Sequence, residues 1–164
     1  MAVGTVAIAL EGVLQAESGG AVIPAGRAMY GGLAKAYSIA IVTDLDPEKA
    51  LHWLKVNEFD QHSYFVPSEP TDPEGIGERR VLQLQRLRAY GCDVQFLVDC
   101  NPEIARSVYL NGFPCMLYLS PQYLRPEHRP DFSGEIKPWD AMVDEVDRVI
   151  EIRTSDPRPG HETL

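Results

Sequence analysis

The sequence predicts an α/β fold: a three-layer sandwich in which helices cover both faces of a five-stranded, mostly parallel, Rossmann-like sheet. Two observations lead to this prediction. Short apolar runs of strand length alternate with longer segments of helical pattern along most of the chain. The strand-like runs are apolar at consecutive positions, as expected for strands buried on both faces. A chain of 164 residues is long enough for one sizeable core, so we expect a single domain.

Five segments have the composition of buried strands. The first reads Val-Gly-Thr-Val-Ala-Ile-Ala-Leu over residues 3–10 and stops at Glu11-Gly12. The other four follow the same pattern and cover residues 38–43, 62–66, 94–98 and 114–119. Strands that alternate with helices form right-handed β-α-β units, which make neighbouring strands parallel.

Four helices are predicted between these strands, over residues 24–37, 47–57, 73–90 and 102–110. Asp46 and Asn101 stand directly before Pro47 and Pro102. An Asp or Asn side chain caps free N–H groups at the start of a helix, and proline suits the first helical position. We therefore expect Asp46 and Asn101 to be the N-caps of their helices.

The remaining segments are less regular. Residues 15–23 are few and contain glycine, so we expect only a hairpin or flap there, a minimal cap. Residues 120–138 are rich in proline and form a strap, and residues 139–153 follow as an amphipathic helix. The predicted domain therefore spans residues 1–153, and residues 154–164 form a flexible tail.

Composition narrows the classes of partner and site. Fifteen Lys and Arg against 24 Asp and Glu give a net charge of −9, which repels a phosphate backbone, so no nucleic-acid partner is expected. The first basic residue is Arg27 and no apolar run reaches the length of a membrane span, so we expect a cytoplasmic protein without membrane contact. Three cysteines without C-x-x-C spacing argue against a disulfide framework and a zinc site.

Polar residues stand at the carboxyl ends of three predicted strands. These ends read Glu11-Gly12, Thr43-Asp44 and Asp99-Cys100-Asn101. In open α/β sheets, ligands bind beyond the carboxyl ends of the strands. A functional site is therefore expected at these residues.

The motifs, in this order, resemble those of the haloacid dehalogenase-like (HAD-like) phosphatase superfamily. Its first motif is an apolar strand running into Asp-x-Asp-Gly, and residues 9–14 here read Ala-Leu-Glu-Gly-Val-Leu. Its second motif is a strand that ends in Thr or Ser, as residues 41–43 do. Its fourth motif often reads Val-Asp-Asp-Asn-Pro-Glu, and residues 98–103 match it at every position except Cys100. The resemblance covers residues 3–120.

This resemblance implies both a strand order and a chemistry. Residues 3–10 are implied to form the central strand, flanked by residues 38–43 and 94–98. In the superfamily a carboxylate attacks phosphorus, and a second carboxylate two residues later protonates the leaving group. A Thr hydroxyl and a Lys or Arg bind the phosphoryl oxygens, while magnesium held by acidic groups offsets the negative charge.

Carried over to this chain, the resemblance implies a damaged site. The nucleophile position is Ala9, which has no atom that can attack phosphorus or hold a cation. Glu11 takes the acid position and Thr43 the position of the phosphate-binding hydroxyl. The cation falls at Arg80 or at its neighbour Arg79.

The implied metal ligands are Asp99, Glu11 and Asp44, the last as a partial replacement for a missing carboxylate. The superfamily's second metal acid falls at Cys100, so charged oxygens are few. Magnesium prefers charged oxygen ligands in near-octahedral geometry, and is therefore expected to bind weakly at best. No other cofactor is expected.

Each assignment has a simpler alternative. Glu11-Gly12 could form a plain turn, Thr43 could cap the turn after it, and Asp99 could be an anion at a helix start. The arginines at 79, 80, 86 and 88 share a helix whose apolar stripe is Val81, Leu84 and Leu87, which favours a solvated basic face.

The expected function follows from the missing nucleophile. We expect a catalytically impaired HAD-like domain that binds a protein partner, acts as a scaffold or associates with itself. The alternative is a magnesium-dependent phosphomonoesterase or nucleotidase of the same superfamily. The layout of residues 125–130 and 138–140 also resembles small phage-encoded members of the superfamily, which implies a phage origin.

Overall fold

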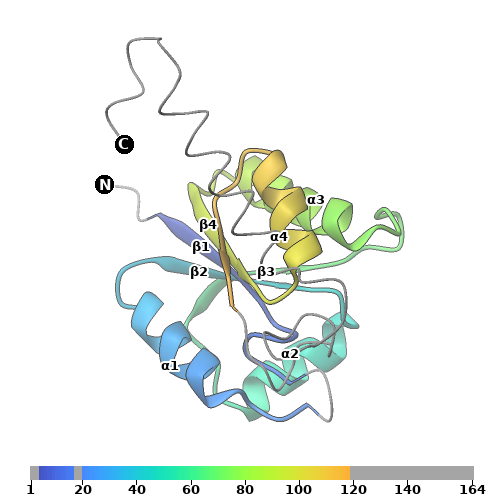
Figure 1. Ribbon diagram of the computed structural model, residues 1–164. Helices are drawn as coiled ribbons and strands as arrows, with labels where there is room; N and C mark the ends of the chain where they lie inside the picture. The colour runs from blue at the N-terminus through green and yellow to red at the C-terminus, as the bar shows by residue number, and fades with distance from the viewer. Residues whose placement is uncertain (1–3, 17–19, 119–164) are drawn as a thin grey trace, which may run out of the picture. The chain divides into compact units, whose positions relative to one another are not determined.

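The computed structural model describes residues 4–16 and 20–118 of the chain. Their strands form one parallel sheet in the order β3-β2-β1-β4-β5. The strands are β1 (Thr5–Ala9), β2 (Ser38–Thr43), β3 (His62–Pro67), β4 (Val94–Asp99) and β5 (Cys115–Leu117). The helices are α1 (Pro24–Leu33), α2 (Pro47–Val56), α3 (Ile76–Ala89) and α4 (Pro102–Leu110). Figure 1 shows α1 and α2 on one face and α3 and α4 on the other, which confirms the predicted three-layer α/β sandwich.

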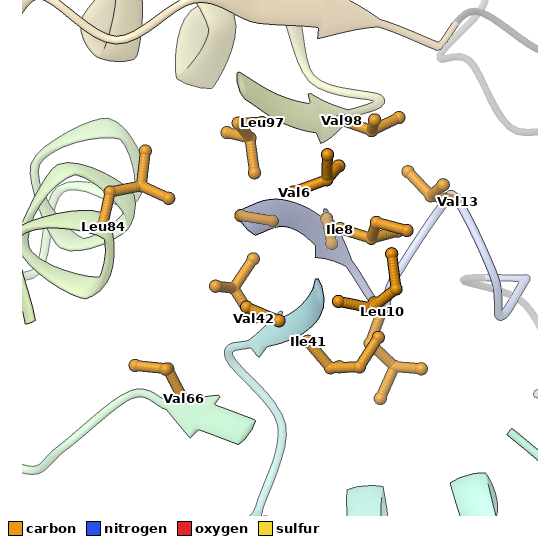
Figure 2. Packing of buried hydrophobic residues seen from close by; sticks show 14 of the residues in the cluster. Val6, Ile8, Leu10, Val13, Ile41, Val42, Val66, Leu84, Leu97 and Val98 are labelled. Atoms are coloured by element: carbon orange, nitrogen blue, oxygen red, sulfur yellow. The ribbon is translucent and has the colours of Figure 1, made fainter. Parts of the chain in front are cut away.

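Strand β1 is the central strand, as the resemblance implied. It pairs in parallel with β2 on one side and with β4 on the other. All of its residues are buried, and its neighbours in the core come from both sheet faces (Figure 2). Burial of one large apolar side chain stabilises a fold by about 1.5–3 kcal/mol. The carboxyl end of β1 is therefore held firmly between those of β2 and β4.

Both predicted N-caps are confirmed. The Asp46 carboxylate accepts a hydrogen bond from the Lys49 N–H of α2 at 3.1 Å. The Asn101 side-chain oxygen accepts one from the Glu103 N–H of α4 at 2.9 Å. Both helices begin right after a strand end, so these caps fix the chain where it leaves β2 and β4.

Two helices are shorter than predicted. Helix α1 ends at Leu33 rather than at Tyr37, and its last turn contains two glycines, which have low helix propensity. Helix α3 begins at Ile76 rather than at Pro73. The Arg79 side chain donates to the carbonyls of Pro73 and Glu74, which holds these two residues in a turn ahead of the helix.

The short flap predicted at residues 15–23 is present in its described part. Gln15 forms an antiparallel bridge with Val22, and the Ala16 N–H donates to the Ala21 carbonyl at 2.8 Å. The Trp53 indole N–H of α2 donates to the Gly20 carbonyl at 2.6 Å and ties the flap to that helix. The described residues of the segment thus pair as the two arms of a small hairpin, as expected.

Several predictions fall on residues that the structure does not describe. These are the strap at 120–138, the helix at 139–153, the tail at 154–164 and the segments compared with phage proteins. In the described part of the chain, no helix combines the length and apolar character that a bilayer crossing requires.

Candidate functional site

The predicted site residues meet at the carboxyl edge of the sheet. Glu11 follows β1, Thr43 ends β2 and Asp99 ends β4, so the parallel order of these three strands places them side by side. The Thr43 hydroxyl donates to Glu11 Oε1 at 2.9 Å. The Cys100 thiol lies 3.7 Å from the Glu11 carbonyl oxygen and links the β4 end to the β1 end.

The Glu11 carboxylate is held by three donors. Its Oε1 accepts from the Thr43 hydroxyl, from the Asp44 N–H at 2.8 Å and from the Leu45 N–H at 3.1 Å. Thr43 is fully buried, so its hydroxyl is fixed in this position. The two N–H groups belong to the turn between β2 and α2. This turn thus presents a concave set of donors to an anionic oxygen.

A buried arginine forms the second half of the site. The Arg80 side chain, from α3, lies 3.1 Å from Asp99 through Nε and 3.5 Å from Asp44 through Nη2. Arg80 is 3% exposed and Asp99 is 2% exposed. The solvated basic face expected for this helix is therefore wrong at Arg80, because two carboxylates draw its guanidinium inward. Arg79 lies further from Asp44, at 3.8 Å.

The charge of Asp99 is balanced inside the protein. Burial raises the pKa of Asp99 above its ordinary value, since a charge is costly away from water. The Arg80 cation and the N–H groups of Asn101 and Cys100 act in the opposite direction. The Arg80–Asp99 pair is thus a buried ion pair whose members depend on each other.

Gln83 connects the two halves of the site, and the sequence analysis missed it. Arg80 Nη1 donates to Gln83 Oε1 at 2.6 Å, and Gln83 Nε2 donates to the Thr43 carbonyl at 2.8 Å. A signal was available in the sequence. Positions 80, 83, 84 and 87 have the spacing of one helix face, and this face points inward. Arg80 and Gln83 are therefore buried on the same face as the apolar residues Leu84 and Leu87.

No protein-family model and no curated protein matches the chain, but solved structures do. The HAD domain of the effector protein Lem4 from Legionella pneumophila matches with a TM-score of 0.51 and 10% identity, over 87% of this chain and 93% of that one. A chain of the Pnkp1/Rnl/Hen1 RNA repair complex matches with a TM-score of 0.57 and 14% identity, over 71% of this chain. The present chain spans only 43% of that complex chain's length. This chain has the HAD-like fold.

The residue that the sequence resemblance places at the nucleophile position, Ala9, is buried. Ala9 is the last residue of β1, pairs in register with Val42 and is 1% exposed. Its methyl group cannot attack phosphorus. The four other predicted residues, Glu11, Thr43, Asp99 and Arg80, do lie together, and Asp44 joins them through Arg80.

The described residues do not fit a magnesium ion. Among them no group of three or more His, Cys, Asp or Glu side chains is placed to hold a metal. The Asp99 carboxylate instead faces the Arg80 guanidinium, and Glu11 Oε1 already accepts three hydrogen bonds. A fixed side-chain cation thus supplies the positive charge beside Asp99.

Proposed function

We propose that this chain is a catalytically silent HAD-like domain whose role is to bind another protein or to hold one in place. The observation that carries the proposal is the buried alanine at the end of β1, Ala9, which the sequence resemblance places at the nucleophile position. In an enzyme that uses covalent catalysis, loss of the nucleophile can lower turnover by about 10⁶-fold. The neighbouring carboxylates are held in place, Glu11 through its Oε1 by three hydrogen bonds, and Asp99 and Asp44 by Arg80.

The engagement of those carboxylates supports the proposal. A general acid must present a proton to a leaving group. Glu11 instead uses one oxygen to accept three hydrogen bonds from the protein itself. Asp99 forms a buried ion pair with Arg80. Neither group is arranged as it would need to be for phosphoryl transfer.

The proposed partner is a protein, or a second copy of this chain. One structural relative comes from an assembly named the Pnkp1/Rnl/Hen1 complex, and that association is a property of that protein. For this chain, the proposal of a protein partner rests on the shared fold alone. A phage origin stays a proposal that rests on the layout of residues 125–130 and 138–140.

A phosphatase assay tests the silent-domain proposal. The full-length chain is assayed with magnesium against a panel of phosphomonoesters and nucleotides, and turnover at background is expected. Turnover that disappears in both Thr43→Val and Asp99→Asn, but persists in the exposed-site control Thr71→Val, would refute the proposal and establish a phosphomonoesterase. Light scattering over a concentration series then separates self-association from the need for a different partner.

A further inference from the structure

We propose that Glu11 is a built-in occupant of an oxyanion cradle, so that the chain keeps its own anion-binding site closed. The cradle consists of the Thr43 hydroxyl and the N–H groups of Asp44 and Leu45. This inference rests on the proposed function, because a working phosphatase would need the cradle to be free.

The geometry of the donors supports the proposal. All three converge on the single atom Glu11 Oε1, at 2.9, 2.8 and 3.1 Å. Hydrogen bonds to a charged acceptor are about twice as strong as neutral ones. Three such donors on one oxygen form a set that is complementary to an oxyanion of any source, whether carboxylate or phosphate.

The donors are preorganised without Glu11. Thr43 is the last residue of β2, its side chain is fully buried, and its carbonyl is held by Gln83. The next residues lead directly into α2, whose first turn is fixed by the Asp46 cap. The cradle is therefore built by the sheet and α2, and Glu11 is added to it from the β1 side.

The other oxygen of Glu11 is consistent with an occupant that fits imperfectly. In the described part of the chain, Oε2 is shielded from solvent and has no hydrogen-bond partner. A buried oxygen without a partner is costly. The cradle thus satisfies one oxygen of this carboxylate and leaves the second unsatisfied.

An internal ligand excludes an external one through its high effective concentration. A tethered group competes at concentrations in the millimolar range or above. Removal of the carboxylate should therefore allow an external oxyanion to enter. Glu11→Ala empties the cradle, whereas Glu11→Gln removes the charge but keeps an oxygen of similar reach in place.

Inorganic phosphate is the probe. Full-length protein is titrated with phosphate against sodium chloride of equal ionic strength, and the melting temperature is followed. Phosphate is expected to bind Glu11→Ala at least about tenfold more tightly than wild type or Glu11→Gln. Thr43→Val in the Glu11→Ala background should weaken that binding about tenfold or more, since a hydrogen bond to a charged group is lost.

Besides a failure of Glu11→Ala to bind phosphate, two results would overturn the proposal. One is equal phosphate binding by Glu11→Gln and Glu11→Ala, because relief of charge repulsion would then explain the gain. The other is a phosphate-dependent shift of the Asp44 and Leu45 amide resonances in wild type at roughly 10 mM phosphate, which would show a free cradle. The second measurement needs no variant, so it decides the matter even if Glu11→Ala does not fold.

The outcome can be separated from that of the phosphatase assay. Failure of Glu11→Ala to bind phosphate leaves a silent wild type as proposed and removes only the self-occupied cradle. Turnover by wild type refutes the silent domain whatever Glu11→Ala binds.

Discussion

Arg80 is the residue on which the charge balance of the site depends. It is a buried cation beside a buried carboxylate, and Arg80 Nε lies 3.1 Å from Asp99 Oδ2. A buried pair adds little compared with well-packed apolar residues, but removal of one partner leaves an uncompensated charge. The Gln83 bond adds a neutral link between this pair and Thr43.

Replacement of Arg80 should therefore destabilise the protein strongly. We expect Arg80→Met to lower the free energy of unfolding by about 3–5 kcal/mol, because Asp99 is left buried without its cation. Urea denaturation measures the change. Arg106→Met is the matched control, because Arg106 is exposed on α4, and it should change stability by no more than about 0.5 kcal/mol. Similar losses in the two variants would contradict the assigned role.

The pH dependence of the same variant gives a second test. Burial raises the pKa of Asp99 in the folded protein, and removal of Arg80 should raise it further. A carboxyl group with a raised folded pKa binds protons more readily when folded, so stability rises as pH falls through that pKa. Arg80→Met should thus regain part of its lost stability as the pH is lowered from neutral toward the ordinary pKa of a carboxyl group. A parallel pH profile in Arg80→Met and in Arg80→Met with Asp99→Asn would argue against this.

At the scale of elements, helix α1 lies close to the turn that carries Glu11. Gly26, in the first part of α1, is buried, and a Cβ atom there would overlap the Val13 carbonyl oxygen. That oxygen belongs to the backbone, so it cannot move aside as a flexible side chain would. By contrast, a Cβ atom at Gly31 would meet nothing within 4 Å.

Two alanine substitutions in α1 should therefore have opposite effects. Gly26→Ala should destabilise the protein by about 1–3 kcal/mol or more, as overpacking against a fixed group does. Gly31→Ala should stabilise it by about 0.5–1 kcal/mol, because alanine is the better helix former. Thermal or urea unfolding of both variants checks this. The packing described here would be wrong if Gly26→Ala proved as stable as Gly31→Ala.

The sequence predicted elements better than it predicted their ends. The run of β2 is apolar at every position between its two end residues, and this pattern alone indicated a buried strand with a candidate functional residue at its end. The early end of α1 and the late start of α3 depend on weak helix propensity and on side-chain contacts of Arg79, which a pattern of apolar residues does not report.

The sequence likewise predicted some features of the site and missed others. Glu11, Thr43 and Asp99 could be predicted because strand ends in a parallel sheet meet at one edge. The burial of Arg80, the link through Gln83 and the N–H groups of Asp44 and Leu45 could not, because they depend on which way α3 and the β2–α2 turn face. A charged side chain on a helix is usually solvated, and only the nearby carboxylates overcome that preference here.

At the scale of the whole molecule, the described fold places the Arg80 cation beside the Asp99 carboxylate at the carboxyl edge of the sheet. A ligand that binds the native state raises its stability by RT ln(1 + [L]/Kd). Because Arg80 already neutralises Asp99, the binding free energy of a magnesium ion at this edge of the sheet is expected to be small. The melting temperature of the wild-type chain is therefore expected to be the same with about 10 mM magnesium as with a chelator.

Restored carboxylates should reverse that result. Ala9→Asp with Cys100→Asp returns two charged oxygens next to Asp99 at the ends of β1 and β4, and magnesium favours such ligands. The double variant should be less stable than wild type without metal, because it buries new charge, and should gain a magnesium-dependent rise in melting temperature. Ala9→Asn with Cys100→Asn, which has the same shape without the charge, should show no rise. If the charged double variant folds and magnesium still leaves its melting temperature unchanged, position 9 is not the nucleophile position.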